Sequence, residues 1–209
     1  MWPMSQFFEI HPQNPQARLI AQAAEIVRQG GVIVYPTDSS YAIGCQLNDK
    51  SALQRIQRIR DLDKNHNFTL VCSDLSQLAL YAKVDNQAFR LVKSHTPGPY
   101  TFILKATSQV PKRLAHPKRK TIGLRVPEHP ITLALLEELG EPMMSCSLIL
   151  SDMDELDLAD IELIRERLEK EVDLIVDGGA TPLQPTTVVD LTEGQPELVR
   201  VGGGVVDWE

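Results

Sequence analysis

The chain has 209 residues, of which 43% are hydrophobic and 23% charged, and its formal net charge is −7. This size and composition predict a one-domain globular protein with a large core, and the acidic balance argues against indiscriminate coating of nucleic acid. The sequence contains no run of about eighteen apolar residues that would span a membrane. Its N-terminus lacks the basic start and apolar centre of a signal peptide. We therefore expect a cytoplasmic protein with no membrane partner.

The cysteines and histidines predict neither disulfides nor a metal site. Cys45, Cys72 and Cys146 are odd in number, far apart and flanked by apolar residues, which is typical of buried, reduced thiols. The five histidines form no close pair with one another or with a cysteine. A dedicated zinc site is therefore not expected.

The first half of the chain predicts helices and strands in alternation. Asn14 followed by Pro15 is a typical helix start, and the glycine pair at 30–31 ends that helix. The branched and aromatic residues at 32–35 predict a buried strand that ends at Pro36, because proline cannot donate a ladder hydrogen bond. The next expected elements are a strand at 42–47, a helix capped by Ser51, a strand at 68–72 and helices at 75–82 and 86–93.

The second half continues the alternation. Strands are expected at 100–104, 121–126, 143–150, 173–176, 187–191 and 198–201, and helices at 131–139 and 158–171. Short connections near 36–47 and 185–201 are compatible with antiparallel pairing. The pattern predicts the α/β class: a single domain over residues 1–209, built on a twisted, open mixed sheet with helices packed on it.

Four small polar residues, at 37–40, follow the strand that ends at Pro36. An α/β protein tends to bind its ligand beyond the ends of buried strands. The same residues, a threonine, an aspartate and two serines, also satisfy turns through hydrogen bonds from side chain to backbone. The sequence leaves both interpretations open.

Further hydroxyl and arginine side chains stand in or beside the other predicted strands: Thr121, Arg125, Ser145, Ser147, Thr186, Thr187 and Arg200. Ser145 and Ser147 share one face of their strand, because strand side chains alternate. Several hydroxyls together with two fixed cations suit a small polar anion or a nucleotide phosphate.

Charge is distributed unevenly along the chain. Residues 111–120 contain five cations and no acid, and residues 151–162 contain six acids and no cation. Such runs are usually solvated faces. The basic run is also the best candidate for contact with phosphate, on a nucleotide or on RNA, and its cations are Lys112, Arg113, Lys118, Arg119 and Lys120. No P-loop, dinucleotide-binding glycine motif or G-x-S-x-G motif occurs.

Five segments resemble, in order and rough spacing, the threonylcarbamoyl-AMP synthase family: YPTDSSYAIG, RIRDLDKNHNFTL, TPGPYTFILK, TIGLRVPEHP and PTTVVDLT with the VRVG that follows. The resemblance covers residues 16–203, nearly the whole chain. The P-T-D-S, Y-A-I-G and N-F-T-L sequences are most similar to the YciO branch of the family.

The resemblance implies a YrdC-like fold with a concave, largely positive cavity. It also implies an activity in which L-threonine, bicarbonate and ATP form threonylcarbamoyl-adenylate and pyrophosphate for a tRNA modification. The implied partners are ATP, L-threonine or a related small acid, and tRNA or double-stranded RNA. Mg²⁺ is expected to arrive with ATP, held by phosphate oxygens and water, and no tightly bound cofactor is expected.

Carried over by position, the resemblance implies roles for residues at two parts of the cavity. Ser39 is expected to contact threonine, and Arg125 is expected to bind its carboxylate. The other substrate-side positions are Thr37, Ser145 and Thr186. The nucleotide-side positions are Arg60, His66, Thr121, Ser147 and Arg200.

The chain departs from the family at positions that matter for catalysis. Catalytic members carry a Lys-x-Arg pair where this chain has Arg60 and Leu62, and an asparagine where it has Ile149. One lost donor to the developing charge costs on the order of 10²–10³ in rate. If the protein is an enzyme, Arg60 and Lys64 are the expected catalytic cations. The alternative is a nucleotide- or RNA-binding relative that uses the basic run and has little synthase activity.

Overall fold

The computed structural model describes residues 4–63 and 66–208. Its helices are α1 Ala17–Arg28, α2 Lys50–Ile59, α3 Leu75–Tyr81, α4 Asn86–Ser94, α5 Pro130–Leu139 and α6 Ile161–Leu168, with a 3-10 turn at Asp157–Ala159. Its strands are β1 Gln6–Glu9, β2 Ile33–Pro36, β3 Tyr41–Gln46, β4 Thr69–Val71, β5 Ala82–Lys83, β6 Tyr100–Ala106, β7 Thr121–Arg125, β8 Met143–Ser147, β9 Leu174–Asp177, β10 Thr187–Asp190 and β11 Glu197–Arg200. None of the described helices has the length and apolar character that crossing a membrane requires.

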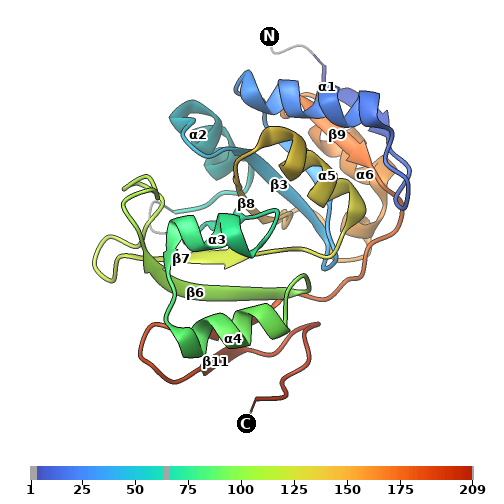
Figure 1. Cartoon of the computed structure of the whole chain (residues 1–209). Helices are drawn as coiled ribbons and strands as arrows, with labels where there is room; N and C mark the ends of the chain where they lie inside the picture. Colours follow the sequence, from blue (N-terminus) through green and yellow to red (C-terminus); the bar gives the residue numbers. More distant parts are fainter. Residues whose placement is uncertain (1–3, 64–65, 209) are drawn as a thin grey trace.

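The strands form one open, mixed sheet. Its order is β1-β9-β2-β3-β8-β4-β7-β6-β10-β11, and β5 pairs with β6 beside this path. The pairs β1–β9, β2–β9, β4–β7 and β6–β10 are parallel, and the others are antiparallel. The predicted class, an α/β fold on an open mixed sheet, is therefore confirmed (Figure 1).

Helix α1 begins later than the sequence predicts. Its first residue is Ala17, preceded by Gln16, and Pro15 lies outside the helix. The backbone N–H of Asn14 donates to Nδ1 of His11 at 3.0 Å, which holds this residue in the preceding turn. The prediction of Asn14 as the helix cap is therefore wrong, although the helix itself is present.

Aspartates cap four other helices, α2, α3, α4 and α6, and two of these caps correct the predicted helix starts. Asp49 accepts a hydrogen bond from the Ala52 N–H at 2.8 Å, so it is the cap of α2, and the prediction of Ser51 is wrong. Asp160 caps α6, and the helix predicted at 158–171 is a short 3-10 turn followed by a helix that ends at residue 168. Side-chain caps depend on local geometry, which the spacing of apolar residues does not determine.

The strand predictions need fewer corrections. The sequence does not predict β1, a short edge strand of exposed and half-buried residues, or the two-residue β5. Strand β8 ends at Ser147 instead of residue 150, because the chain turns Leu148 and Leu150 into the core. The remaining predicted boundaries lie within two residues of those observed.

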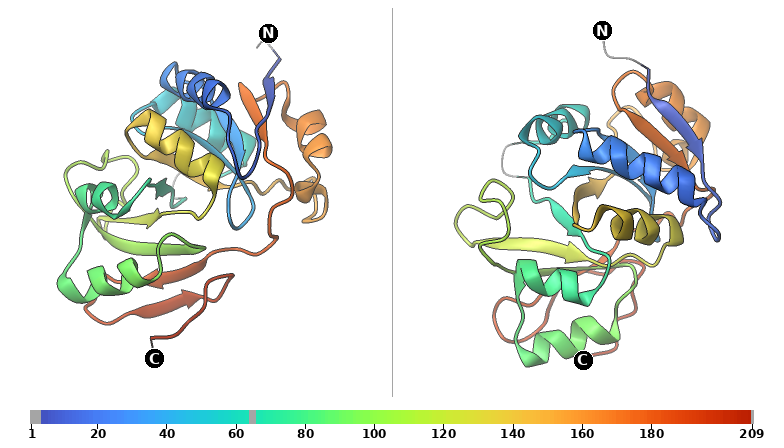
Figure 2. Two further views of the ribbon diagram at one scale, coloured as in Figure 1. Left: turned by 45° about the vertical axis from the view of Figure 1, so that its right-hand side comes forward. Right: turned by 45° about the horizontal axis from the view of Figure 1, so that its top comes forward.

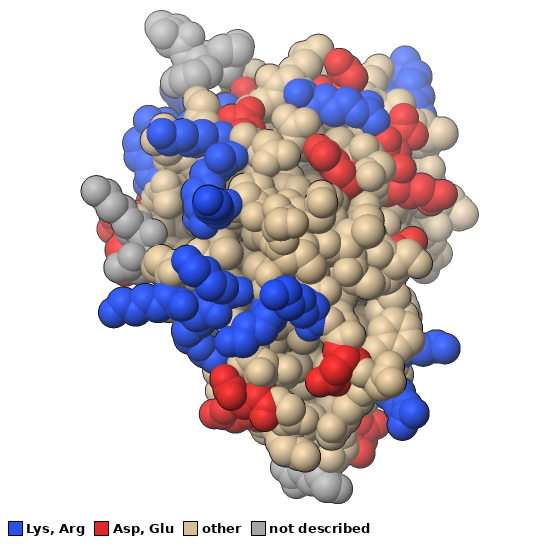
Figure 3. All heavy atoms as spheres, turned by 60° about the vertical axis from the view of Figure 1, so that its left-hand side comes forward, with Lys and Arg blue, Asp and Glu red and all other residues tan. Residues whose placement is uncertain are grey.

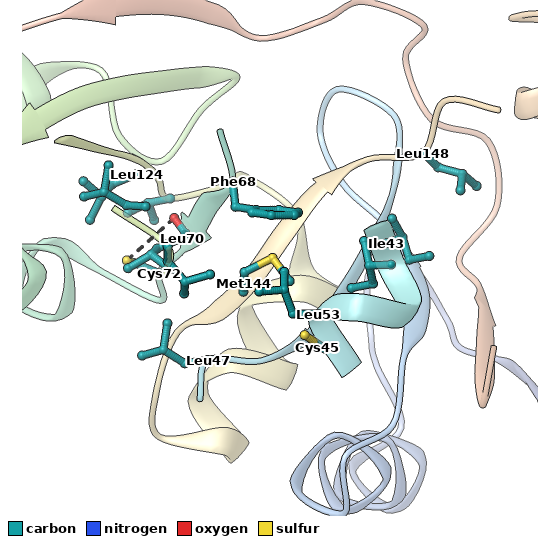
Figure 4. Close-up of a cluster of buried hydrophobic side chains, with 14 of the residues drawn as sticks. Ile43, Cys45, Leu47, Leu53, Phe68, Leu70, Cys72, Leu124, Met144 and Leu148 are labelled. Carbon is teal, nitrogen blue, oxygen red and sulfur yellow. Dashed lines mark hydrogen bonds between the residues drawn. The ribbon is translucent and has the colours of Figure 1, made fainter. Parts of the chain in front are cut away.

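Apolar side chains cover both faces of the central strands. Val34 of β2 lies in one buried cluster, whereas Ile33 and Tyr35 lie in the other, because strand side chains alternate. Helices α1 and α5 pack side by side over the second cluster (Figure 2). The first cluster, part of which is drawn in Figure 4, also holds the free cysteines Cys45 and Cys72, whose burial the sequence predicts.

A buried arginine ties α2 to the sheet. Nη1 of Arg55 donates to Oδ2 of Asp173 at 2.7 Å, and Nη2 donates to the Glu171 carbonyl at 3.0 Å. The same Asp173 oxygen accepts from the Val32 N–H at 2.8 Å, directly before β2. One carboxylate thus joins α2, the start of β2 and the segment that leads into β9.

Replacing Asp173 with alanine would remove the partner of a buried cation and leave the Val32 N–H unpaired. We expect Asp173→Ala to lower the free energy of unfolding by about 3 kcal/mol, measured by urea denaturation. Asp152→Ala is the control, because Asp152 forms an exposed ion pair with Arg167 at 2.6 Å and exposed pairs contribute little. Equal losses in the two variants would contradict this account.

Candidate functional site

A cavity of about 400 Å³ collects side chains from many strands of the sheet. Ten residues predicted at its substrate and nucleotide sides line it: Thr37, Ser39, Arg60, His66, Thr121, Arg125, Ser145, Ser147, Thr186 and Arg200. Lys64, the other predicted catalytic residue, lies outside the described residues. Four arginines line the cavity, and no described aspartate or glutamate does, so the lining is positive. The fold thus brings the candidates together, and their individual roles stay predictions.

Burial divides the cavity into two parts. Its floor is formed by residues that are all buried: Tyr35, Ser39, Arg125 and Ser145. Its mouth is formed by half-buried or exposed residues: Arg60, His66, Arg119, Ser147 and Arg200. Because the mouth is closer to water, it suits a highly charged group, whereas the floor suits a small group whose charges are all paired.

A hydrogen-bonded tyrosine closes the floor. The Tyr35 hydroxyl lies 2.6 Å from Oγ of Ser145, which itself donates to the Ile43 carbonyl at 3.2 Å. Since Ser145 gives its proton to that carbonyl, Tyr35 is the donor between the two hydroxyls. Burial raises the pKa of Tyr35 to about 12, although the Ser145 hydrogen bond and the nearby Arg125 act in the opposite direction. The phenol therefore stays neutral at physiological pH.

Residues 37–40 form a turn and line the cavity at the same time. Oγ1 of Thr37 donates to the Ser40 carbonyl at 2.6 Å and accepts from the N–H groups of Ser39 and Ser40 at 3.1 and 3.2 Å. Thr37, Ser39 and Ser40 all line the cavity. The two interpretations of this stretch are therefore compatible, because the turn is what holds the serines in place.

Arg125 is the buried cation of the floor. It forms an ion pair with Oδ1 of Asp38, and its Nη1 donates to Oγ of Ser39 at 3.1 Å. Asp38 is held in turn by the Glu128 N–H, which donates to Oδ2 at 2.8 Å. Burial lowers the pKa of Arg125, and the charge of Asp38 counters that effect. Nε of Arg125 is buried and has no hydrogen-bond partner among the described residues.

Arg60 stands at the mouth of the cavity. Its Nε donates to the Ile149 carbonyl at 3.0 Å. The ring of His66 packs edge-on against Phe68, with centroids 5.3 Å apart, and its pKa is lowered by burial and by the charge of Arg60. His66 is therefore neutral at pH 7, so it adds a polar group to the mouth without adding charge.

Arg200 stands at the mouth as well and is held by a threonine. Its Nε and Nη2 donate to the carbonyl and Oγ1 of Thr186 at 3.0 and 3.1 Å, and Thr186 Oγ1 lies 2.8 Å from Oγ1 of Thr101. Within the described part of the chain, neither Arg60 nor Arg200 forms an ion pair. Their charges are oriented by neutral oxygens, which leaves them to attract an anion.

The cations of the basic run do not all reach the cavity. Of the five, only Arg119 lines it, and the exposed remainder is Lys112, Arg113, Lys118 and Lys120. Figure 3 shows lysine and arginine side chains gathered on the face that lies to the left in Figure 1, where the loop between β6 and β7 projects. The solvated-face interpretation therefore fits most of this run.

Two residues of the cavity lining have no signal in the sequence. Tyr35 belongs to a strand pattern and His116 to the basic run, and neither pattern predicts a place at the cavity. Thr187, by contrast, points elsewhere, since its Oγ1 donates to the Gly204 carbonyl at 2.7 Å. In the described ranges, no three His, Cys, Asp or Glu side chains are placed to hold a metal ion.

Comparison with known proteins finds close relatives over nearly the whole chain. The Sua5/YciO/YrdC family model, described as "Telomere recombination", matches residues 25–202. The chain is 63% identical over 203 residues to the Escherichia coli "Uncharacterized protein YciO", which covers 97% of this chain and 98% of that protein. The crystal structure of E. coli YciO matches with a TM-score of 0.91 and 61% identity, over 97% of this chain and 98% of the other.

More distant relatives include threonylcarbamoyl-AMP synthases. The Pyrococcus abyssi threonylcarbamoyl-AMP synthase is 31% identical over 183 residues, which make up 87% of this chain and 53% of the synthase. The crystal structure of P. abyssi Sua5 complexed with L-threonine matches with a TM-score of 0.86 and 27% identity, over 95% of this chain and 58% of that chain. This chain thus spans little more than half the length of the archaeal proteins.

The buried tyrosines predict how stability depends on alkaline pH. Burial raises the pKa values of Tyr35 and Tyr41 from 10.0 to about 12. The unfolded chain loses these protons from pH 10 upward, whereas the folded protein keeps them up to about pH 12. Their contribution to stability is therefore complete below pH 10, and the free energy of unfolding should fall by roughly 2–3 kcal/mol per tyrosine as pH rises to 12.

Tyr35→Phe isolates one of the two groups. Chemical denaturation at a series of pH values should give a shallower fall for this variant than for the wild-type protein, whatever its stability at neutral pH. The same slope in both proteins would contradict a buried, neutral phenol at the floor of the cavity.

Proposed function

Because this chain belongs to the Sua5/YciO/YrdC family, we propose that its cavity binds ATP and L-threonine and joins them, through bicarbonate, into threonylcarbamoyl-adenylate. The proposal rests on one observation. A single cavity has a buried arginine at its floor and, at its mouth, two arginines oriented by neutral oxygens. The structure of a relative complexed with L-threonine supports threonine as the small substrate.

The floor fits the carboxylate of an amino acid. Nη1 and Nη2 of Arg125 are bound to Ser39 and Asp38, whereas Nε is buried without a described partner. A buried donor without an acceptor costs about 1–3 kcal/mol, and a carboxylate at this place would remove that cost. The Ser39 hydroxyl stands beside it and supplies a further polar contact for threonine, whereas the Thr37 hydroxyl is already occupied by the hydrogen bonds of the turn.

The proposed reaction has two steps. The threonine amine attacks the bicarbonate carbon, an N–C bond forms, and water leaves. An oxygen of the resulting carbamate then attacks the α-phosphorus of ATP, the bond to the β-phosphate breaks, and pyrophosphate leaves. Arg60 and Arg200 would stabilise the negative charge that develops on this leaving group. Mg²⁺ would arrive on the phosphates of ATP and supply further charge neutralisation.

Two side chains predict a slow reaction. Leu62 packs against the core, so Arg60 is the cation that the described residues 60–63, directly after α2, supply to the cavity. Ile149 offers only its carbonyl, and Arg60 occupies it. Since each missing donor costs on the order of 10²–10³ in rate, we expect turnover well below that of a synthase that has both groups.

The first experiment is an assay of pyrophosphate release from the purified protein with ATP, Mg²⁺, bicarbonate and single amino acids. Release should be greatest with L-threonine, and it should disappear without bicarbonate, because the carbamate cannot form. L-Serine is the matched comparison, since it lacks only the methyl group. Two outcomes would overturn the proposal. One is pyrophosphate release that is just as large without an amino acid, and the other is no pyrophosphate release with any of the amino acids.

Variants at the mouth test the nucleotide contacts separately from turnover. Arg60→Gln and Arg200→Gln should each weaken ATP binding roughly tenfold or more in calorimetric titrations, because each loses a charge-assisted hydrogen bond to phosphate. Arg58→Gln removes the same charge from an exposed position on α2 outside the cavity lining. If all three variants lose affinity equally, net charge and not direct contact is responsible.

The basic face favours a second candidate function, binding of tRNA or double-stranded RNA. Lys112, Arg113, Lys118 and Lys120 are exposed and lie outside the cavity lining. Figure 3 shows lysine and arginine side chains gathered on the face where the loop between β6 and β7 projects. The net charge of −7 opposes tight nonspecific binding. RNA affinity that falls steeply with salt would support this function, because phosphate contacts release counterions.

A further inference from the structure

The basic run contains a tight turn at residues 116–121 that places its side chains individually. The His116 N–H donates to the Thr121 carbonyl at 2.8 Å, and the Lys120 N–H donates to the His116 carbonyl at 2.9 Å. Nδ1 of His116 accepts from the N–H groups of Lys118 and Arg119 at 3.3 and 3.0 Å. The turn is therefore fixed by its own hydrogen bonds, and the histidine ring is part of it.

This turn separates two side chains from the lysines beside them. His116 and Arg119 line the cavity, whereas Lys118 and Lys120 are exposed outside its lining. The sequence shows a uniform basic run, but the structure assigns one of its arginines and its histidine to the cavity. Their place at the cavity is thus a property of the turn and not of the charge of the segment.

Arg119 is anchored from outside the cavity. Its Nη2 donates to Oδ2 of Asp190 at 2.8 Å, and Oδ1 of the same carboxylate accepts from the backbone N–H and Oγ1 of Thr192 at 2.9 and 2.5 Å. Burial would raise the pKa of Asp190, but the hydrogen bonds from Thr192 and Arg119 lower it, so the carboxylate is charged. In the described structure Nε and Nη1 of Arg119 have no partner, and they stay available to a ligand.

His116 offers a donor of its own. Because Nδ1 accepts two backbone hydrogen bonds, the neutral ring must carry its proton on Nε2. Among the described residues, Nε2 has no protein partner. An imidazole N–H donor and a partly exposed guanidinium, both set in a rigid turn, form a wall that suits phosphate oxygens.

We propose that His116 and Arg119 bind a phosphate group of the nucleotide in the cavity, as an additional contact beside Arg60 and Arg200. The inference rests on the proposed function only in that a nucleotide enters the cavity, and it does not need turnover. A carboxylate is the weaker choice of ligand, because the side chain of Arg119 is 49% exposed at the mouth and the buried site for a carboxylate is Arg125.

The test is titration of the full-length protein with ATP and with adenosine. Arg119→Gln should raise the Kd for ATP roughly 10- to 100-fold and leave adenosine binding within about twofold, since only ATP carries phosphates. His116→Asn is the second variant, because its side-chain oxygen can accept the same backbone bonds and keep the turn while Nε2 is lost. It should weaken ATP binding in the same direction.

Lys118→Gln is the matched control, since it removes one positive charge from the same turn without touching the cavity lining. It should leave the Kd for ATP within about twofold. Wild-type thermal melting in all variants establishes that the fold is kept. Equal losses in Arg119→Gln and Lys118→Gln would overturn the proposal, as would unchanged ATP binding by Arg119→Gln or no ATP binding by the wild-type protein.

The outcomes separate this inference from the proposed reaction. Weak ATP binding by Arg119→Gln, with no pyrophosphate release from the wild-type protein, would support the phosphate contact and reject the synthase activity. Pyrophosphate release by the wild type, with unchanged ATP affinity in Arg119→Gln, would support the synthase activity and reject the phosphate contact. A loss of RNA affinity in both Arg119→Gln and Lys118→Gln, with ATP binding intact, would assign the turn to RNA and overturn the inference.

Discussion

The buried ion pair between Arg125 and Asp38 is the interaction on which the site depends. A guanidinium without a partner in this place would be strongly unfavourable, and removal of one member of such a pair typically costs 3–5 kcal/mol. Arg125 ends β7, whereas Asp38 follows β2, and the strands β3, β8 and β4 lie between them in the sheet. The pair therefore links the ends of β2 and β7 across the three strands between them, and Arg125 forms part of the floor of the cavity. Thr132 Oγ1 donates to the Pro36 carbonyl at 2.7 Å and so holds the end of β2, two residues before Asp38.

The four cavity arginines fall into two electrostatic classes. Arg125 and Arg119 are each paired with an aspartate that lies outside the cavity lining, so their charge is largely compensated and their geometry is rigid. Arg60 and Arg200 are held by neutral oxygens, so they supply the net positive charge. A chain with a net charge of −7 thus keeps a positive cavity by placing these two aspartates behind the arginines and not in the cavity lining. Donors that are oriented before the ligand arrives need no reorganisation when it binds.

Much of the fold could be predicted from the sequence, and the reason is periodicity. The buried run before Pro36 and the glycines that end helices are local signals, and signals of this kind predict the order of most strands and helices. Asn14 and Ser51 failed as caps because neighbouring side chains, His11 and Asp49, make the competing hydrogen bonds. The short edge strand β1 carries too few buried residues to show a period.

For the site, too, local interactions could be predicted from the sequence and distant ones could not. Thr37 and Ser39 follow a recognisable strand end, so the sequence marks them as candidates for a ligand site, although the same pattern also fits a turn. The partner of Arg125 could not be predicted, because it lies 87 residues away in the chain and only the sheet order brings it near. The composition of the basic run does not distinguish its cations from one another. The turn places Arg119 at the cavity and leaves Lys118 outside the lining, and this depends on hydrogen bonds that the composition does not predict.

The two parts of this cavity are held by different parts of the fold. Arg125 with Asp38, and the hydroxyls around them, are enclosed by the sheet and fixed by its core, so the geometry of the floor is set by the fold itself. In the proposed reaction, stabilisation of the leaving pyrophosphate depends on the mouth, where Leu62 packs into the core and Ile149 presents only a carbonyl. Substitutions at the mouth therefore leave the floor undisturbed. Because Arg119 comes from a separate turn with its own aspartate anchor, a cation can be supplied to the mouth independently of the segment that follows α2.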